Sequence, residues 1–246
     1  KKPVIIYLHG SGFSHIAWVP LAGQFTQKGY SVLVLDFPGH GNSEGMALRT
    51  IEENAKWLKE LLKKLDLKKA SLVGHSQGAL TALEFASSNP ELITKLCLMS
   101  ASHSMPVHPD LIKMAENDDD QAIELMLKWC YAGHSGNIIT EYGQVLTNNK
   151  SIEVAKMILK SKKYSEVLAA DLNACNNYKN GLYSAKNISC PTMIISGDKD
   201  KMISLDKATD LSSHIKDSSL EVVKNAGHMI TSEETVKIRS ILSKFF

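Results

Sequence analysis

The chain has 246 residues, of which 43% are hydrophobic and 22% charged, and its formal net charge is +2. This length allows one α/β domain, or two small ones, with a sizeable core. The near-neutral charge excludes a broad basic surface, so no nucleic-acid partner is expected. No apolar run is long enough to span a bilayer.

The cysteines give an indication of the cellular compartment. They lie far apart, in no metal-binding or redox spacing, at Cys97, Cys130, Cys175 and Cys190. We therefore expect free thiols in a reducing, cytoplasmic location, and no signal segment opens the sequence. The chain starts at Lys1 without a methionine and enters a predicted strand at once, which is compatible with residues preceding it.

Strand and helix patterns alternate through the first hundred residues. Continuous apolar runs, typical of strands buried in parallel sheets, lie at residues 3–8, 31–35, 71–73 and 95–99. Helix patterns follow at 18–28 and 77–85, and a long amphipathic helix follows a capping box formed by Thr50 and Glu53. This alternation predicts a mostly parallel, doubly wound sheet.

The strand signal disappears after the fourth predicted strand. Residues 103–187 show no strand signal, only helical stretches such as Ala122–Tyr131 and Ile152–Lys160, with breaks at 133–137, 147–149 and 173–181. Strands return at 192–196 and 220–223, with helices at 205–213 and 233–246. We therefore predict a helical cap at 103–187, inserted into a core made of residues 1–102 and 188–246.

The segment around Ser76 has the pattern of a catalytic turn. Gly74 and Gly78 bracket the serine between an apolar strand and a run of good helix formers. Such a turn presents a serine hydroxyl at its tip, and the glycines let neighbouring backbone pass close by. The Gln77 N–H, at the start of the helix, is then placed to stabilise an oxyanion. A serine N-cap in a glycine-rich turn is the plain alternative.

A serine nucleophile needs a base and an acid that orients it. Two later loops offer them: Asp198 and Asp200 follow the strand at 192–196, and His228 follows the strand at 220–223. Functional groups of parallel sheets gather at the carboxyl ends of strands, and the order serine, acid, histidine is that of an α/β-hydrolase. We predict a triad of Ser76, His228 and one of the two aspartates.

The motifs together resemble the α/β-hydrolase superfamily across nearly the whole chain. The residues that match are His9-Gly10-Ser11-Gly12, Asp36 to Ser43, the Ser76 turn, Gly197 to Asp200 and Gly227-His228. The resemblance implies the α/β-hydrolase fold with a helical cap, and it places the acid at Asp200, with Asp198 as the fallback. It also implies oxyanion donors at the backbone N–H groups of Ser11, with Gly12 next, and Gln77. The family's usual N-terminal antiparallel strands have no counterpart here.

The resemblance implies a carboxylesterase that acts through an acyl-enzyme on a small to medium ester, without metal or organic cofactor, as a monomer or homodimer. A serine at the turn argues against the dehalogenase and epoxide hydrolase branches, which use aspartate. Hydrolysis of a carbon–carbon bond in a vinylogous diketone acid is the alternative, because His9 to Gly12 also resembles that branch. Peroxide-dependent perhydrolysis and a receptor that keeps the triad stay open as further hypotheses.

Overall fold

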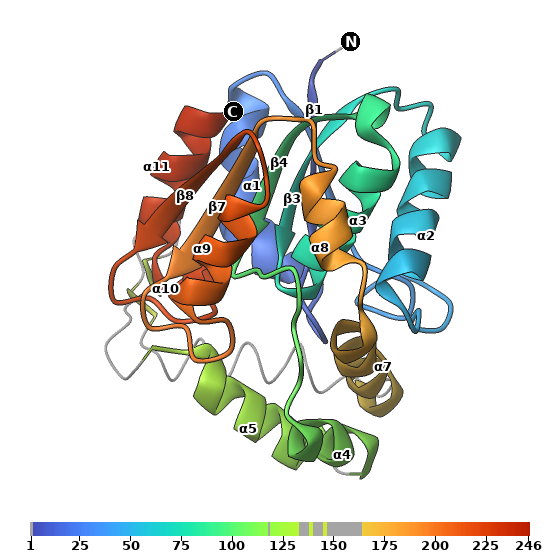
Figure 1. The fold of residues 1–246 in the computed structure, drawn as a ribbon, viewed down its shortest axis with the longest axis vertical. Helices are drawn as coiled ribbons and strands as arrows, with labels where there is room; N and C mark the ends of the chain where they lie inside the picture. Colours follow the sequence, from blue (N-terminus) through green and yellow to red (C-terminus); the bar gives the residue numbers. More distant parts are fainter. Residues whose placement is uncertain (1, 118, 133–137, 140–144, 147–163) are drawn as a thin grey trace.

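A six-stranded parallel sheet forms the centre of the molecule. The computed structural model describes residues 2–117, 119–132, 138–139, 145–146 and 164–246. The strand order is β2-β1-β3-β4-β7-β8, and every pair is parallel (Figure 1). The strands are β1 (Val4–Leu8), β2 (Ser31–Leu35), β3 (Ala70–His75), β4 (Ile93–Met99), β7 (Thr192–Gly197) and β8 (Ser218–Val223). The order reverses direction between β1 and β3, which is where open α/β sheets bind ligands.

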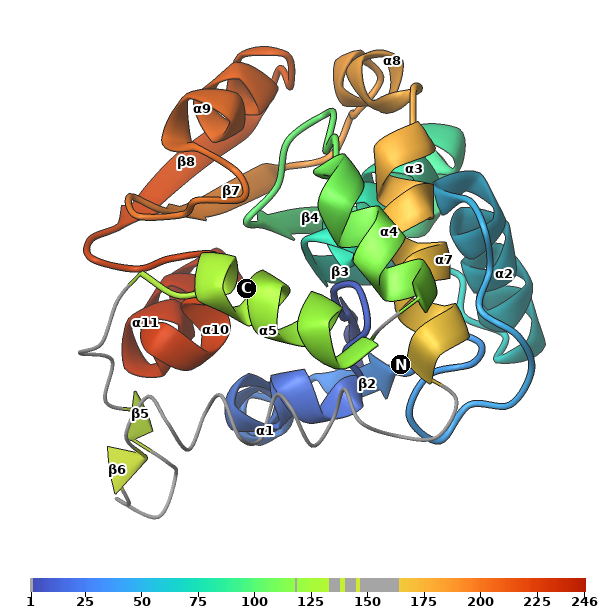
Figure 2. The same ribbon diagram turned by 90° about the horizontal axis from the view of Figure 1, so that it is seen from below.

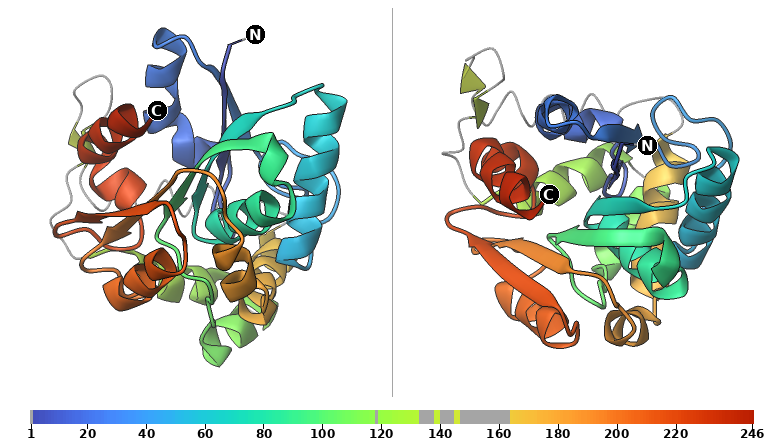
Figure 3. Two further views of the ribbon diagram at one scale, coloured as in Figure 1. Left: turned by 45° about the horizontal axis from the view of Figure 1, so that its top comes forward. Right: turned by 90° about the horizontal axis from the view of Figure 1, so that it is seen from above.

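Helices cover both faces of this sheet (Figure 3). One face carries α1 (Val19–Gln27), α10 (Ile230–Glu233) and α11 (Thr235–Phe245). The other carries α2 (Ile51–Lys64), α3 (Gln77–Ser88), α8 (Gly181–Lys186) and α9 (Leu205–Ser213). Because side chains alternate along a strand, Ile6 and Leu8 enter one core while Ile5 and Tyr7 enter the other. This explains the continuous apolar runs in the sequence.

The start of α2 has the predicted cap. Thr50 Oγ1 accepts a hydrogen bond from the Glu53 backbone N–H at 3.0 Å, and Glu53 Oε2 accepts one from the Arg49 N–H at 2.8 Å. The first bond satisfies one of the N–H groups that a helix start leaves without partners. Glu53 bonds to the residue before the cap, instead of the Thr50 N–H that a capping box uses. Short 3₁₀ helices at His15–Trp18 and Pro90–Leu92 directly precede α1 and β4.

A separate helical layer lies over the carboxyl ends of the strands (Figure 2). It consists of α4 (Pro109–Asn117), α5 (Asp119–Cys130) and α7 (Tyr164–Asn177). These helices share an apolar cluster that also takes in Phe13 and Met229 from two sheet loops. This helical layer lies within the predicted cap, whereas α8 packs against α3 beside the sheet. The cap boundaries at 103 and 187 stay a prediction.

The structure differs from the sequence prediction inside residues 103–187. A short antiparallel pair, β5 (Ile138–Ile139) and β6 (Val145–Leu146), lies where only helices were predicted. Two-residue strands are too short to produce a periodic signal. The predicted break at 173–181 is also wrong in part, because α7 continues to Asn177, with Ala174 and Cys175 packed into the core. The predicted helix Ile152–Lys160 lies outside the described residues. Among the described residues, no helix has the length and apolarity that crossing a membrane requires.

Candidate active site

Ser76 lies at the tip of the turn between β3 and α3. Its backbone has φ +53° and ψ −119°, a conformation that non-glycine residues rarely adopt. A Cβ at Gly74 would lie 2.3 Å from the Gly78 carbonyl oxygen, and a Cβ at Gly78 would lie 2.3 Å from that of Leu8. Strand, turn and helix therefore approach each other at a distance that only glycine permits.

His228 and Asp200 meet beyond the ends of β8 and β7. His228 Nδ1 lies 2.9 Å from Asp200 Oδ2, and only 4% and 0% of their side-chain areas are exposed. Burial alone would raise the pKa of Asp200, but facing His228 and the backbone N–H groups of Met202 and Ile203 lower it overall. The ionised carboxylate holds the His228 proton on Nδ1, which leaves Nε2 as the basic atom.

Asp198, the other candidate acid, belongs to a turn. Its Oδ1 accepts a hydrogen bond from the Asn225 backbone N–H at 2.6 Å, and its Oδ2 lies 3.8 Å from Lys224 Nζ. Asp198 thus closes the loop beside β8. Of the two aspartates that the sequence leaves open, Asp200 is the one beside His228.

The backbone of His228 is held from several sides. Its N–H donates to the Cys130 carbonyl of α5 at 2.7 Å. Its own carbonyl accepts hydrogen bonds from Ser100 Oγ and His75 Nε2, both at 2.8 Å. Burial, followed by the charge of His228, lowers the pKa of His75 to about 3, so His75 is a neutral donor. The backbone of His228 is therefore held by both the sheet and the helical layer.

Ser76 and His228 line one cavity of about 390 Å³. Ser76 Oγ makes no hydrogen bond to any described residue, so Ser76 and His228 share the cavity without a direct bond. Such bonds are often long in unliganded enzymes and tighten when a substrate binds. The remaining lining is mostly apolar and includes Met105, Val107, Leu111, Trp129, Leu172, Met202 and Ile203, with Lys201 and His108 as its basic residues.

The backbone N–H groups of Ser11 and Gln77 are the predicted oxyanion donors. Neither the Ser11 N–H nor the Gln77 N–H has an acceptor within the described part of the chain. Gly12, the second choice on the first loop, instead donates its N–H to Asp171 Oδ2 at 2.7 Å. Because Ser11 and Ser76 both line the cavity, the geometry favours Ser11 over Gly12 as the donor.

The sequence reasoning missed Asp171 and Glu233. Asp171, on α7, is 1% exposed and bonds to both loops that bear the candidate oxyanion donors. The sequence feature that could have identified Asp171 is a carboxylate on an apolar helix face: Leu168 lies three residues before it and Cys175 four residues after it. Glu233 accepts the Gly227 N–H at 3.0 Å and the Ala132 N–H at 2.9 Å, which fixes the loop before His228.

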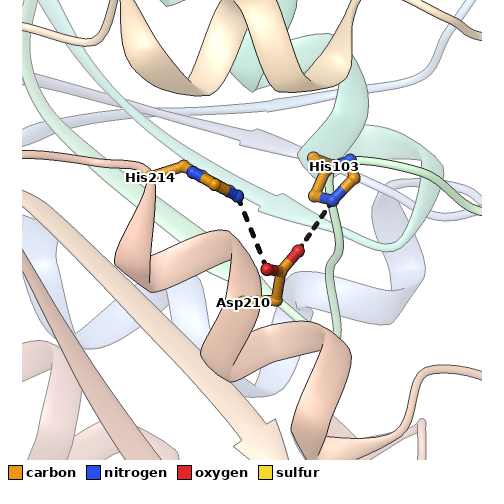
Figure 4. A group of neighbouring side chains, drawn as sticks. All are labelled: His103, Asp210 and His214. Carbon is orange, nitrogen blue, oxygen red and sulfur yellow. Dashed lines mark hydrogen bonds and ion pairs between the residues drawn. The ribbon is translucent and has the colours of Figure 1, made fainter.

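One cluster among the described residues has the donor set of a transition-metal site (Figure 4). Asp210 and His214 belong to α9 and its C-terminus, and His103 follows β4. His103 Nε2 lies 2.8 Å from one Asp210 oxygen and His214 Nε2 lies 3.4 Å from the other. None of the three lines the cavity of Ser76, and the carboxylate already pairs with both imidazoles.

A larger hollow of about 930 Å³ lies between the loop after β2 and helix α7, with Gly45, Arg49 and Asn173 in its lining. It contains neither Ser76 nor His228. Chemical groups, rather than volume, identify a reactive site. We therefore assign the candidate site to the smaller cavity.

Comparison with known proteins places this geometry in a family. The model of the alpha/beta hydrolase fold family matches residues 3–235. The chain is 28% identical to a 2-hydroxy-6-oxononadienedioate/2-hydroxy-6-oxononatrienedioate hydrolase of Pseudomonas putida, over 91% of this chain and 80% of that protein. It is also 28% identical to a thermophilic esterase of known structure, with a TM-score of 0.81 over 100% of this chain and 89% of the other.

An enol-lactonase from Burkholderia xenovorans has a TM-score of 0.86 and 20% identity, over 100% of this chain and 91% of that chain. At this identity the likeness shows a shared fold. The family model spans the parallel sheet, the serine turn and the loops that bear Asp200 and His228. The chain is thus a hydrolase that belongs to the alpha/beta hydrolase fold family.

Proposed function

We propose that Ser76, His228 and Asp200 form the catalytic triad of a serine hydrolase. The observation that supports this most is the buried contact of 2.9 Å between His228 and Asp200, at a cavity that Ser76 also lines. The contact orients the imidazole so that Nε2 faces away from the carboxylate. A surface histidine with an exposed acid would offer no such fixed base.

The proposed reaction has two steps. Ser76 Oγ attacks the substrate carbonyl carbon while His228 Nε2 takes its proton, and the Ser11 and Gln77 N–H groups donate to the developing oxyanion. The imidazolium then protonates the leaving group as its bond to the carbonyl carbon breaks. Water, deprotonated by His228, attacks the acyl-Ser76 carbonyl and releases a carboxylic acid. The same steps serve an oxygen or a carbon leaving group.

For the bond that is broken, we propose first a carbon–carbon bond of a vinylogous diketone acid. Several curated relatives that cover most of this chain are named as 2-hydroxy-6-oxononadienedioate/2-hydroxy-6-oxononatrienedioate hydrolases, at 24–28% identity. In such a substrate the enol must first become a ketone, as the 2-hydroxyl proton moves to the carbon that will leave. The leaving carbon is then conjugated through the remaining double bond with the 2-carbonyl, which stabilises its negative charge as a dienolate until His228 supplies a proton.

The cavity itself favours a substrate with fewer charges than those dicarboxylates. Its described lining is mostly apolar and contains one lysine or arginine, Lys201, which is suited to one carboxylate. The arginines of the sequence lie elsewhere: Arg49 lines the larger hollow, and Arg239 donates to the Pro20 carbonyl. We therefore propose a substrate with one carboxylate and an apolar body.

A carboxylic ester is the second candidate. The apolar lining and the volume of about 390 Å³ suit a small to medium acyl chain, and the similar thermophilic esterase supports this choice. An ester needs no basic residue in the cavity. Substitution of Lys201 by glutamine would therefore weaken turnover of a carboxylate substrate and leave that of an uncharged ester unchanged.

Parallel assays of wild type and Ser76→Ala decide between these bonds. One series contains 2-hydroxy-6-oxo dienoic acids with one or two carboxylates, and the other contains p-nitrophenyl esters from acetate to a long acyl chain. Serine-dependent cleavage of the diketone acids, fastest with one carboxylate, would support the first proposal. Turnover of esters alone would support the second. Absence of both from folded protein would contradict both substrate proposals and favour the receptor that keeps the triad.

A further inference from the structure

A single buried carboxylate links the two loops that bear the proposed oxyanion donors. Asp171, on α7, accepts the Gly12 N–H on Oδ2 at 2.7 Å and a hydrogen bond from Gln77 Nε2 on Oδ1 at 2.9 Å. Gly12 follows Ser11 directly, and Gln77 is itself the second proposed donor. One side chain of the helical layer therefore spans both sides of the oxyanion site.

His40 completes the environment of this carboxylate. Its Nε2 lies 2.8 Å from Asp171 Oδ2, and its Nδ1 lies 3.0 Å from the Pro38 carbonyl oxygen. Because a carbonyl oxygen only accepts, Nδ1 carries a proton, and Nε2 donates the other proton to the carboxylate. Burial lowers the pKa of His40, but the charge of Asp171, the hydrogen bond to it and the hydrogen bonds to backbone groups together outweigh burial, so the net shift is upward. The carboxylate is thus paired with a buried imidazolium and its charge is compensated.

The opposite side of the Ser11 loop is held by His9. Its Nδ1 donates to the Gly10 carbonyl at 2.9 Å, and its Nε2 accepts the Phe37 N–H at 3.1 Å. Burial, and then the charge of His40, lowers the pKa of His9 to about 4, which keeps this histidine neutral. His9 fixes the start of the loop, and the Phe13 N–H closes the turn on the Gly10 carbonyl at 3.1 Å. The bond from Gly12 to Asp171 ties this turn to α7.

We propose that Asp171 is a positioning residue that sets the separation of the Ser11 and Gln77 N–H groups. This inference rests on the triad proposed above. Oxyanion donors act only when they point at the place where charge develops, and a displacement of about 1 Å reduces rates by roughly 100-fold. Because Asp171 belongs to α7, the oxyanion site is complete only while the helical layer is seated on the sheet.

Substitution of Asp171 by asparagine tests this directly. The amide keeps the shape of the carboxylate but loses the charge that faces His40. Its new donor faces Gly12 and His40, which also donate, or faces Gln77, whose amide must then turn so that Oε1 accepts. The probe is a fluorophosphonate ester. Ser76 Oγ forms a bond to phosphorus, fluoride leaves, and the serine proton passes to His228. We expect the phosphonylation rate to fall by about 10- to 100-fold, and kcat for the best substrate to fall by a similar factor with little change in KM.

The matched control is Glu84→Gln. Glu84 lies on α3, the helix that Gln77 begins, and its Oε2 accepts hydrogen bonds from Tyr178 Oη at 2.7 Å and Ser184 Oγ at 2.8 Å. It links α3 to the segment after α7 without lining the cavity of Ser76. A carboxylate-to-amide change here should leave the phosphonylation rate within about twofold of wild type. Thermal unfolding of both variants verifies that they are folded at the assay temperature.

A second variant, Gln77→Met, removes the same link from the other side and keeps the backbone N–H. Its rate should also fall, and the double variant with Asp171→Asn should lose less than the product of the two single effects. If Asp171→Asn does not fold, Gln77→Met alone decides the outcome.

Three results would overturn the inference: folded Asp171→Asn reacting as fast as wild type, Glu84→Gln losing as much, or a loss confined to KM. Failure of the proposed function looks different. In that case wild type itself is not phosphonylated, or labelling persists in Ser76→Ala.

Discussion

Alanine at Gly78 should separate α3 from β1 and widen the proposed oxyanion site. Its Cβ would lie 2.3 Å from the Leu8 carbonyl oxygen and 2.5 Å from that of His9. An ordinary contact begins at 3.4 Å, so the two backbones must move apart by about 1 Å. Neither partner is the flexible end of a side chain, so the strain cannot be relieved by a rotamer change.

This displacement increases the distance between the two proposed oxyanion donors by a similar amount, because Ser11 follows β1 and Gln77 begins α3. We expect kcat to fall by roughly 100-fold. Forcing a methyl group into a packed contact also destabilises proteins by about 1–3 kcal/mol, which lowers Tm by several degrees in a chain of this size. Steady-state kinetics with the best substrate and thermal unfolding measure the two effects.

Gly23→Ala is the control for the loss of a glycine. Gly23 is exposed within α1, so alanine there should raise stability by about 0.5–1 kcal/mol and leave kcat unchanged. The reasoning would be refuted if folded Gly78→Ala turned over substrate within threefold of wild type. Equal losses in both variants would refute it as well.

Other variants probe the triad and its supports. Asp200→Asn should lower kcat by about 10⁴-fold while Asp198→Asn retains most activity, and the reverse order in kinetics would move the acid to Asp198. Ser76→Gly should unfold at a higher temperature than the equally inactive Ser76→Ala, since relief of about 1–3 kcal/mol of backbone strain exceeds the entropic cost of glycine. The unfolded chain protonates His75 below about pH 6.5, whereas burial and His228 lower its folded-state pKa to about 3. The free energy of unfolding, measured by urea titration, should therefore fall as pH drops through this range, and fall less in His75→Gln.

The sheet could be predicted from sequence because its strands are buried on both faces. All six predicted strands agree with the structure to within two residues at each end. The edge strand β8 begins with the partly exposed Ser218 and Ser219, which carry no apolar signal, and its start was therefore placed too late. The helical layer was harder to predict because short, half-exposed helices have weaker periodicity, and the asparagines of 173–177 suggested a break that packing overrides.

The candidate triad is readable from sequence because each member follows a strand, and parallel strands bring their ends together. Asp171 has no such marker. Its partners Gln77, His40 and Gly12 lie 94, 131 and 159 residues away in the chain. Only the seating of α7 on the sheet brings them together, and a lone sequence holds no information on that docking. The choice between Asp198 and Asp200 likewise depends on how a single turn folds.

The carbonyl of Cys130 affects how this protein can be re-engineered. It accepts the N–H groups of both His228 and Met229, at 2.7 and 3.0 Å, from the last residue of α5. Chimaeras that exchange the helical layer to alter substrate range would remove this acceptor along with the old lining. The replacement segment must therefore place the carbonyl of a helix end in the same position. A recombination junction placed after residue 132 would keep the Cys130 carbonyl and exchange only the segment that follows it.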